Sequence, residues 1–252
     1  MIEVQDFTKL YGQHLAVDRL SFRVHPGEIL GLVGPNGAGK TTTLRGLAGI
    51  LAPTSGTIRI GGVDIAEDPL AAKASLAYVP DNPSLFESLT VEEHLKFMAT
   101  LYRVPEAVAE IPGLLADFDL GDKRHALASE LSRGMRQKLA ICCAHLHRPR
   151  VILLDEPLNG LDPRGIRQMR SWIASRAAAQ VTLVVSSHQL DLVERLCHRV
   201  LALQHGHVVL MGSLDEIRAR FPELNASATL EEIFFHAIEH SGDVPWPSER
   251  EP

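Results

Sequence analysis

Cysteine is scarce in this chain of 252 residues, and no stretch of it stays apolar for long. Cys142, Cys143 and Cys197 form neither a C-x-x-C pair nor an even framework, which excludes a disulfide scaffold and is typical of a reducing cytosol. No apolar run approaches the roughly 18 residues that a membrane-spanning helix needs. The N-terminus lacks the pattern of a signal peptide. We therefore expect a cytoplasmic protein.

An excess of positive charge is also missing. Lys and Arg number 25 against 31 Asp and Glu, so the formal net charge is −6. This balance argues against a nucleic-acid partner, which would require a basic face, and against adsorption to an anionic membrane. The composition, 45% hydrophobic and 22% charged, is ordinary for a globular protein of one large or two small domains.

What stands out is a glycine-rich stretch, 34–41, that fits the phosphate-loop pattern G-x-x-x-x-G-K-[ST]. An apolar run at 28–33 predicts a strand before it, and apolar residues at helical spacing up to Leu51 predict a helix after it. Lys40 would neutralise the β- and γ-phosphates, and the Thr41 hydroxyl would ligate Mg²⁺. The alternative is a plain glycine turn. We predict a nucleotide site formed by Gly34, Pro35, Asn36, Gly37, Ala38, Gly39, Lys40, Thr41 and Thr42.

Acidic residues follow a second apolar run. Residues 151–154 do not alternate, as in a parallel strand buried on both faces, and ligands bind at the carboxyl ends of such strands. We expect Asp155 to hold Mg²⁺ through its water shell and Glu156 to polarise the attacking water. His188 follows a strand at 181–185 and would contact the γ-phosphate and align the water with Glu156; the alternative is a hydrogen-bonded core edge.

Upstream segments predict a small antiparallel sheet, with strands at 2–7, 20–24 and 57–60. Tyr11 falls in the loop between the first two, where it would stack on a base or simply lie on the surface. A further strand at 75–79 runs into Pro80-Asp81-Asn82-Pro83, whose two prolines predict a shaped loop.

Helical patterning dominates from about 86 to 146, which predicts a helical subdomain inserted in an α/β core. Thr90 and Glu93 form a capping box near its start. Ser132 is a candidate cap of its last helix, and we expect the open N-terminus of that helix to be either an anion site or an ordinary cap. Residues 213–238 predict a closing helical extension, and the last dozen a frayed tail.

In this order the motifs resemble the nucleotide-binding subunit of an ATP-binding-cassette (ABC) transporter, over about residues 2–220. The correspondences run along the chain: the A-loop Tyr11, Walker A 34–41, the signature 131–135, Walker B with the catalytic Glu156, the D-loop 160–162 and the switch His188. The resemblance implies an α/β fold with a P-loop NTPase core of mostly parallel sheet, a small antiparallel β subdomain and the inserted helical subdomain. Residues 1–220 would form a single cassette, and 221–252 a C-terminal helical extension and tail.

Two motifs depart from the family pattern. Asp81 stands where the Q-loop usually has Gln; its carboxylate could still ligand Mg²⁺ but adds negative charge near the phosphates. The signature reads Leu-Ser-Arg-Gly-Met instead of Leu-Ser-Gly-Gly-Gln, and it keeps Ser132 and Gly134, the positions that the family places on the γ-phosphate. This signature and the stretch 78–86 are similar to the exporter-like subfamily with separate membrane subunits.

The resemblance implies an ATPase with ATP and Mg²⁺ as cofactors. Two such subunits, identical or related, would pair head to tail, each ATP lying between the Walker A of one chain and the signature helix of the other. A separate integral-membrane subunit would dock near 81–90, where Phe86 and Leu89 could equally be local core, and would hold the protein at the cytoplasmic face of the membrane. A soluble ABC-type ATPase of translation or DNA repair, or a regulatory ATP switch, is the alternative. Cargo and direction of transport are not encoded here.

Overall fold

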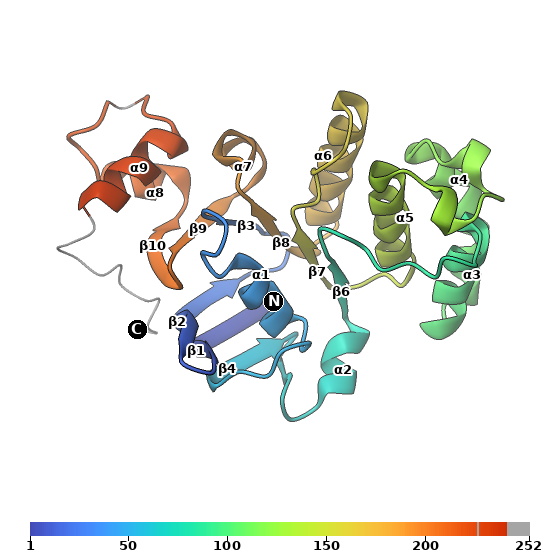
Figure 1. The fold of residues 1–252 in the computed structure, drawn as a ribbon, viewed down its shortest axis with the longest axis horizontal. Helices are drawn as coiled ribbons and strands as arrows, with labels where there is room; N and C mark the ends of the chain where they lie inside the picture. The colour runs from blue at the N-terminus through green and yellow to red at the C-terminus, as the bar shows by residue number, and fades with distance from the viewer. Residues whose placement is uncertain (226, 241–252) are drawn as a thin grey trace.

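Two sheets frame the computed structural model, which describes residues 1–225 and 227–240 (Figure 1). The first is antiparallel, in the order β2-β1-β4-β5. The second has the order β10-β9-β3-β8-β7-β6 and is parallel except for β10 at its edge. The strands are β1 (Ile2–Tyr11), β2 (His14–Val24), β3 (Ile29–Val33), β4 (Ser55–Ile60), β5 (Val63–Asp64), β6 (Leu76–Val79), β7 (Val151–Asp155), β8 (Thr182–Ser187), β9 (Arg199–Gln204) and β10 (His207–Gly212).

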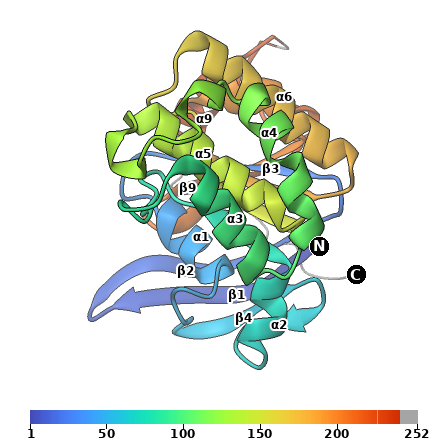
Figure 2. The same cartoon turned by 90° about the vertical axis from the view of Figure 1, so that its right-hand side faces the viewer.

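Helices cover the six-stranded sheet and extend beyond it on either side (Figures 1 and 2). Helices α3 to α5 lie at the end of the molecule opposite to α8 and α9. The α-helices are α1 (Lys40–Leu47), α2 (Pro69–Ala74), α3 (Val91–Leu101), α4 (Ile111–Asp117), α5 (Arg133–Leu146), α6 (Pro163–Ala178), α7 (Leu190–Leu196), α8 (Leu214–Ala219) and α9 (Leu230–His240), and short 3₁₀ turns lie at Pro105–Glu110, Gly121–Lys123 and Ala128–Glu130.

The parallel strands are buried on both faces. Leu153 of β7 packs into a core shared with α1 and the antiparallel sheet, whereas its neighbours Ile152 and Leu154 pack into a second core on the opposite face. Each fully buried side chain of this size contributes about 1.5–3 kcal/mol relative to exposure. The apolar runs do not alternate because both faces of these strands are buried, as the sequence predicts. The α/β class with a mostly parallel sheet is confirmed.

The N-terminal hairpin is longer than its alternation predicts. Strand β1 continues to Tyr11, which pairs with His14, so Tyr11 ends a strand and the expected loop position is wrong. Register shifts interrupt the ladder, and Asp6 and Arg19 adopt positive φ angles of 50° and 41°. Each irregularity shifts the alternation of inward and outward side chains by one residue. The alternation of apolar and polar residues in the sequence therefore does not reveal where the strand continues.

The hairpin of β9 and β10 is missing from the expected elements. Its turn, His205-Gly206, has φ angles of 50° and 82°, as a two-residue turn with both central residues left-handed requires. The hairpin bears on the phosphate loop, because the Gly206 N–H donates to the Ala38 carbonyl at 3.0 Å. A His-Gly pair between apolar runs is the signal that could have predicted it.

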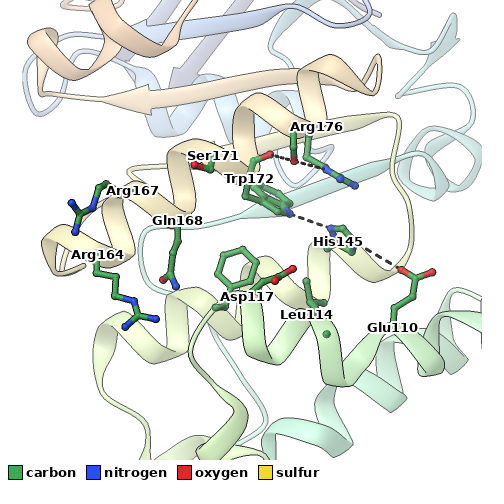
Figure 3. Close-up of a pocket in the computed structure, with 13 residues that line it drawn as sticks. Glu110, Leu114, Asp117, His145, Arg164, Arg167, Gln168, Ser171, Trp172 and Arg176 are labelled. Atoms are coloured by element: carbon green, nitrogen blue, oxygen red, sulfur yellow. Dashed lines mark hydrogen bonds and ion pairs between the residues drawn. The ribbon is translucent and has the colours of Figure 1, made fainter.

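The chain between β6 and β7 is built around α3, α4 and α5, as the helical patterning predicts. The capping box of Thr90 and Glu93 is present. Helix α5 is joined to α6 by a hydrogen bond of 3.1 Å from the Trp172 indole N–H to His145 Nδ1 (Figure 3). A cavity of about 720 Å³ lies between α4, α5 and α6 beside this bond. The assignment of this segment as a subdomain, and of 1–220 as a single cassette, stays a prediction. The expected tail falls on residues 241–252, outside the described residues.

Helix α3 is tied to the segment that follows α4 by an ion cluster. Glu92 accepts two hydrogen bonds of 2.7 Å from the Arg124 guanidinium and lies 2.8 Å from Lys96 Nζ. The bonds from Arg124, followed by that from Lys96, lower the pKa of Glu92 from 4.5 to about 2. Because the folded-state pKa is depressed, the cluster stabilises the fold fully above about pH 4.5, and this stability is lost as the pH falls toward 2.

We expect Glu92→Gln to lower the melting temperature at pH 6 and the difference from wild type to shrink as the pH falls from 4.5 toward 2. Thermal unfolding followed by circular dichroism across this range measures it. Glu87→Gln is the matched control, since Glu87 is exposed and lies 3.8 Å from Arg136. A difference for Glu92→Gln that does not change with pH would contradict the assignment.

Candidate nucleotide site

A cavity of about 470 Å³ opens at the carboxyl ends of the parallel strands. Every predicted site residue lines it except Gly34, Ser132 and Gly134. Two cavities of larger volume contain none of the predicted residues, so size does not identify the site. The lining residues are Tyr11, His14, Ala16, Pro35, Asn36, Gly37, Ala38, Gly39, Lys40, Thr41, Thr42, Asp81, Asp155, Glu156, Asn159 and His188.

The phosphate loop can be made only with glycine at two of its positions. Gly34 has a φ of 145°, and a Cβ there would lie 2.2 Å from the Leu203 carbonyl oxygen of β9. Gly39 has a φ of 108°, and its Cβ would lie 2.6 Å from the Ala16 carbonyl oxygen of β2. At both positions the positive φ angle and the nearby carbonyl oxygen exclude any residue with a side chain. The loop is therefore held between the two sheets.

Helix α1 starts at the floor of the cavity with its N-terminus free for an anion. No side chain caps it at Gly39, and its first turn carries no acidic residue. Its unpaired N–H groups and the positive end of its dipole favour a phosphate there.

Lys40 is buried in the same place. Its Nζ donates to the carbonyl oxygens of Gly34, at 2.7 Å, and Pro35, at 3.2 Å, and lies 3.8 Å from Glu156 Oε1. Burial lowers the pKa of Lys40, while Glu156 and Asp155 oppose this shift. A buried cation beside open helix N–H groups makes the floor of the cavity a strong anion site.

Asp155 is the centre of a hydroxyl network. It is buried and accepts from Thr41 Oγ1 at 2.9 Å, from Ser186 Oγ at 2.6 Å and from the Tyr78 hydroxyl at 3.4 Å. Burial first, and then the Asp155 charge, raise the pKa of Tyr78 to about 12, so it remains a donor. Ser186 is a site residue that sequence reasoning missed, although it lies at the end of the strand beside Asp155.

The oxygens of Thr41 and Asp155 fit Mg²⁺, which prefers hard oxygen ligands. Among the described residues, no group of three His, Cys, Asp or Glu side chains could hold a metal ion. Mg²⁺ in proteins is usually held by one or two carboxylates and completed by substrate phosphates and water.

Glu156 lies in a strained backbone conformation between Lys40 and His188. Its φ is 48°, in the left-handed region, and its N–H bonds to the hydroxyl and the carbonyl oxygen of Ser186 at 3.0 and 3.2 Å. Its Oε2 is 3.0 Å from His188 Nδ1. Such strain is typical of functional positions, because it fixes a side chain where unstrained backbone would not place it.

Asp81 lines the cavity, but its carboxylate is engaged by two neighbours. Its Oδ1 accepts from Arg133 Nη2 at 2.8 Å and from Asn159 Nδ2 at 3.2 Å. Neither Arg133 nor Asn159 was among the predicted site residues. An Asn and an Arg beside a carboxylate carry no recognisable spacing, so no local signal could have found them.

The signature residues lie outside the cavity of their own chain. Ser132 is exposed and caps α5 by accepting from the Met135 N–H at 3.3 Å. A Cβ on Gly134 would lie 2.8 Å from the Gly160 carbonyl oxygen, so close packing within this chain also requires glycine there. Ser132 is thus accessible to a second molecule.

A phosphate loop, a buried aspartate beside its threonine and a glutamate paired with a histidine define an ATPase of the P-loop class. The profile of the family described as ABC transporter matches residues 17–159. The chain is 34% identical over 223 residues to the ABC-type transporter ATP-binding protein EcsA of Bacillus subtilis (strain 168), covering 88% of this chain and 90% of that protein. It is 40% identical over 214 residues to the Nod factor export ATP-binding protein I of Paraburkholderia xenovorans (strain LB400), covering 84% and 70%.

A solved structure described as the ATP binding subunit of an ABC transporter superposes with a TM-score of 0.90 at 34% identity, over 94% of this chain and 99% of that one. The chain belongs to the ABC transporter family. Within the family it is an ATP-binding subunit, and such subunits are ATPases coupled to transport and work with membrane subunits.

We expect Lys40→Ala to weaken ATP binding about 100-fold or more, because two charge-assisted hydrogen bonds of about 1.5–3 kcal/mol each are lost. Titration calorimetry measures the affinity, with thermal unfolding to verify the fold. Lys123→Ala, which removes an exposed lysine that does not line the cavity, should bind as wild type does. Unchanged affinity in Lys40→Ala would refute the phosphate-loop assignment.

Proposed function

We propose that this chain binds Mg²⁺ and ATP in the cavity described above, pairs head to tail with a second ATP-binding subunit, and hydrolyses ATP to drive a separate integral-membrane subunit. The observation that carries the proposal is the separation of two anion sites. The phosphate loop faces the cavity, whereas Ser132 lies exposed at the start of α5, outside that cavity. A triphosphate held by both sites must then join two chains.

The roles of the residues follow from their contacts. The free N-terminus of α1 and Lys40 hold the β- and γ-phosphates, and Tyr11, at the rim, stacks on the base. Thr41 and Asp155 hold Mg²⁺, which neutralises phosphate charge. Glu156 accepts the proton of the attacking water, and His188 keeps the Glu156 carboxylate and the γ-phosphate in line.

The second chain completes the site. Its own Ser132 and Gly134, at the N-terminus of its α5, contact the γ-phosphate held by the first chain. ATP thereby holds the dimer closed, and hydrolysis releases it. The partner is a second copy of this chain or a related subunit.

The membrane subunit docks near 81–90, beside α3. Phe86 is 57% exposed and packs edge to face on Phe97 with ring centroids 5.4 Å apart, and Phe97 and Leu101 of α3 are also exposed. Adjacent exposed aromatic side chains mark an interaction surface. This partner would hold the protein at the cytoplasmic face of the membrane. None of the helices that the structure describes is itself long and apolar enough to cross a membrane. The name of the Paraburkholderia relative, a Nod factor export protein, favours export.

We expect Glu156→Gln to bind ATP normally but to lower turnover by about 10²- to 10⁴-fold, because the general base is lost while the phosphate contacts remain. The ATP-bound dimer should accumulate. Steady-state phosphate release and light scattering with ATP measure the two effects. Turnover at the parent rate would show that Glu156 is not the base, and a protein that stays monomeric with ATP would refute the head-to-tail dimer.

We expect Phe86→Asp to abolish co-purification with the membrane subunit in mild detergent, because a charge replaces the apolar anchor. ATP binding should be retained. Phe235→Asp is the matched control: Phe235 is 53% exposed and lies on α9, at the opposite end of the molecule from α3 (Figure 1). If Phe86→Asp still co-purifies with the partner, the docking surface lies elsewhere.

A further inference from the structure

Two of the residues that depart from the family pattern, Asp81 and Arg133, contact each other. Arg133 Nη2 lies 2.8 Å from Asp81 Oδ1, and the same oxygen accepts from Asn159 Nδ2 at 3.2 Å. Asp81 belongs to the loop after β6, Arg133 opens α5, and Asn159 lies in the loop after β7. One carboxylate therefore joins three segments that are distant in sequence.

The Arg133 side chain is positioned by the backbone beneath it. A Cβ on Gly160, which has a φ of 74°, would lie 3.3 Å from Arg133 Cδ, so the aliphatic stem packs against this glycine. The neighbouring Gly134 packs on the Gly160 carbonyl group in turn. The guanidinium is thus directed to Asp81 by packing as well as by charge.

The charge balance of the cavity gives this contact a consequence. Three carboxylates line it, and each has its own partners: Asp155 accepts hydroxyl hydrogen bonds, Glu156 lies between Lys40 and His188, and Asp81 is paired with Arg133. Without that pairing, Asp81 would present a full negative charge to an incoming triphosphate.

We propose that Arg133 is a positioning residue that neutralises Asp81 and draws its carboxylate toward α5, so that the cavity accepts a triphosphate despite an acid at this position. The inference rests on the proposed nucleotide site. The pair is half-exposed, with side-chain exposures of 56% and 41%, so its contribution to fold stability is small. Its effect is on the electrostatic potential at the position of the phosphates. One uncompensated charge there changes the affinity for ATP by about three- to tenfold.

Metal-free ATP is the sensitive probe, because Mg²⁺ itself neutralises charge and an unpaired Asp81 would also attract it. We expect Arg133→Gln to weaken ATP binding about three- to tenfold in EDTA at low salt, and by a smaller factor with Mg²⁺ present. Titration calorimetry on the full chain, at concentrations where light scattering shows a monomer, measures both affinities. Arg133→Lys, which keeps the charge, should bind nearly as wild type does.

A double-mutant cycle distinguishes the neutralisation of Asp81 by Arg133 from a direct contact between Arg133 and the nucleotide. In the Asp81→Asn background, Arg133→Gln should no longer weaken binding, since no charge remains to be neutralised. Arg164→Gln is the matched control: Arg164 is exposed, pairs with Asp119 at 2.6 Å, and lies on α6 beside the cavity between α4, α5 and α6 (Figure 3). It should leave both affinities unchanged.

Three results would overturn the proposal: unchanged metal-free affinity in Arg133→Gln, an equal loss in the Asp81→Asn background, or an equal loss in Arg164→Gln. The second would show that Arg133 acts on the nucleotide directly, and the third that net charge alone matters. If the wild-type chain itself fails to bind ATP, the proposed nucleotide site is refuted instead.

Discussion

Parallel pairing of β3, β8 and β7 brings three strand ends to one edge of the six-stranded sheet. The phosphate loop follows β3, Glu156 follows β7, and His188 follows β8. Register places Asp155 opposite Ser186 and Val33 opposite Ser187, so the three polar ends meet without any long loop. Because alternate side chains of these strands pack into two different cores, a slip of this register would disrupt the packing of both, and the cores therefore fix the geometry of the site.

Two charged side chains of the site, Lys40 and Glu156, are held in unfavourable surroundings or conformations. Lys40 is removed from water and bonded to backbone carbonyl groups, and Glu156, in a left-handed conformation, is bonded to His188. These contacts fix the positions of both side chains in the cavity. Electrostatic preorganisation of this kind lowers the reorganisation needed when substrate binds.

The start of α5 lies outside the nucleotide cavity of its own chain. Ser132 caps α5 on the surface, while its neighbour Arg133 turns back to Asp81 in the same protomer. Two adjacent residues therefore point in different directions, Ser132 to the surface and Arg133 to a carboxylate that lines the nucleotide cavity. The ion pair with Asp81 joins the start of α5 to the lining of the cavity.

Local sequence was enough to determine the phosphate loop, the strand before Asp155 and Glu156, the helix caps at Thr90 and Ser132, and the α/β class, because each depends on neighbours within a few residues. Tertiary structure alone decided the rest. Tyr11 ends a strand because bulges continue a ladder that alternation cannot trace, and the β9–β10 hairpin adds strands that support the loop. Ser186, Asn159 and Arg133 join the site only because packing brings distant segments together. Their contacts depend on the distances and orientations between segments that are far apart in the chain, and local sequence patterns do not specify these.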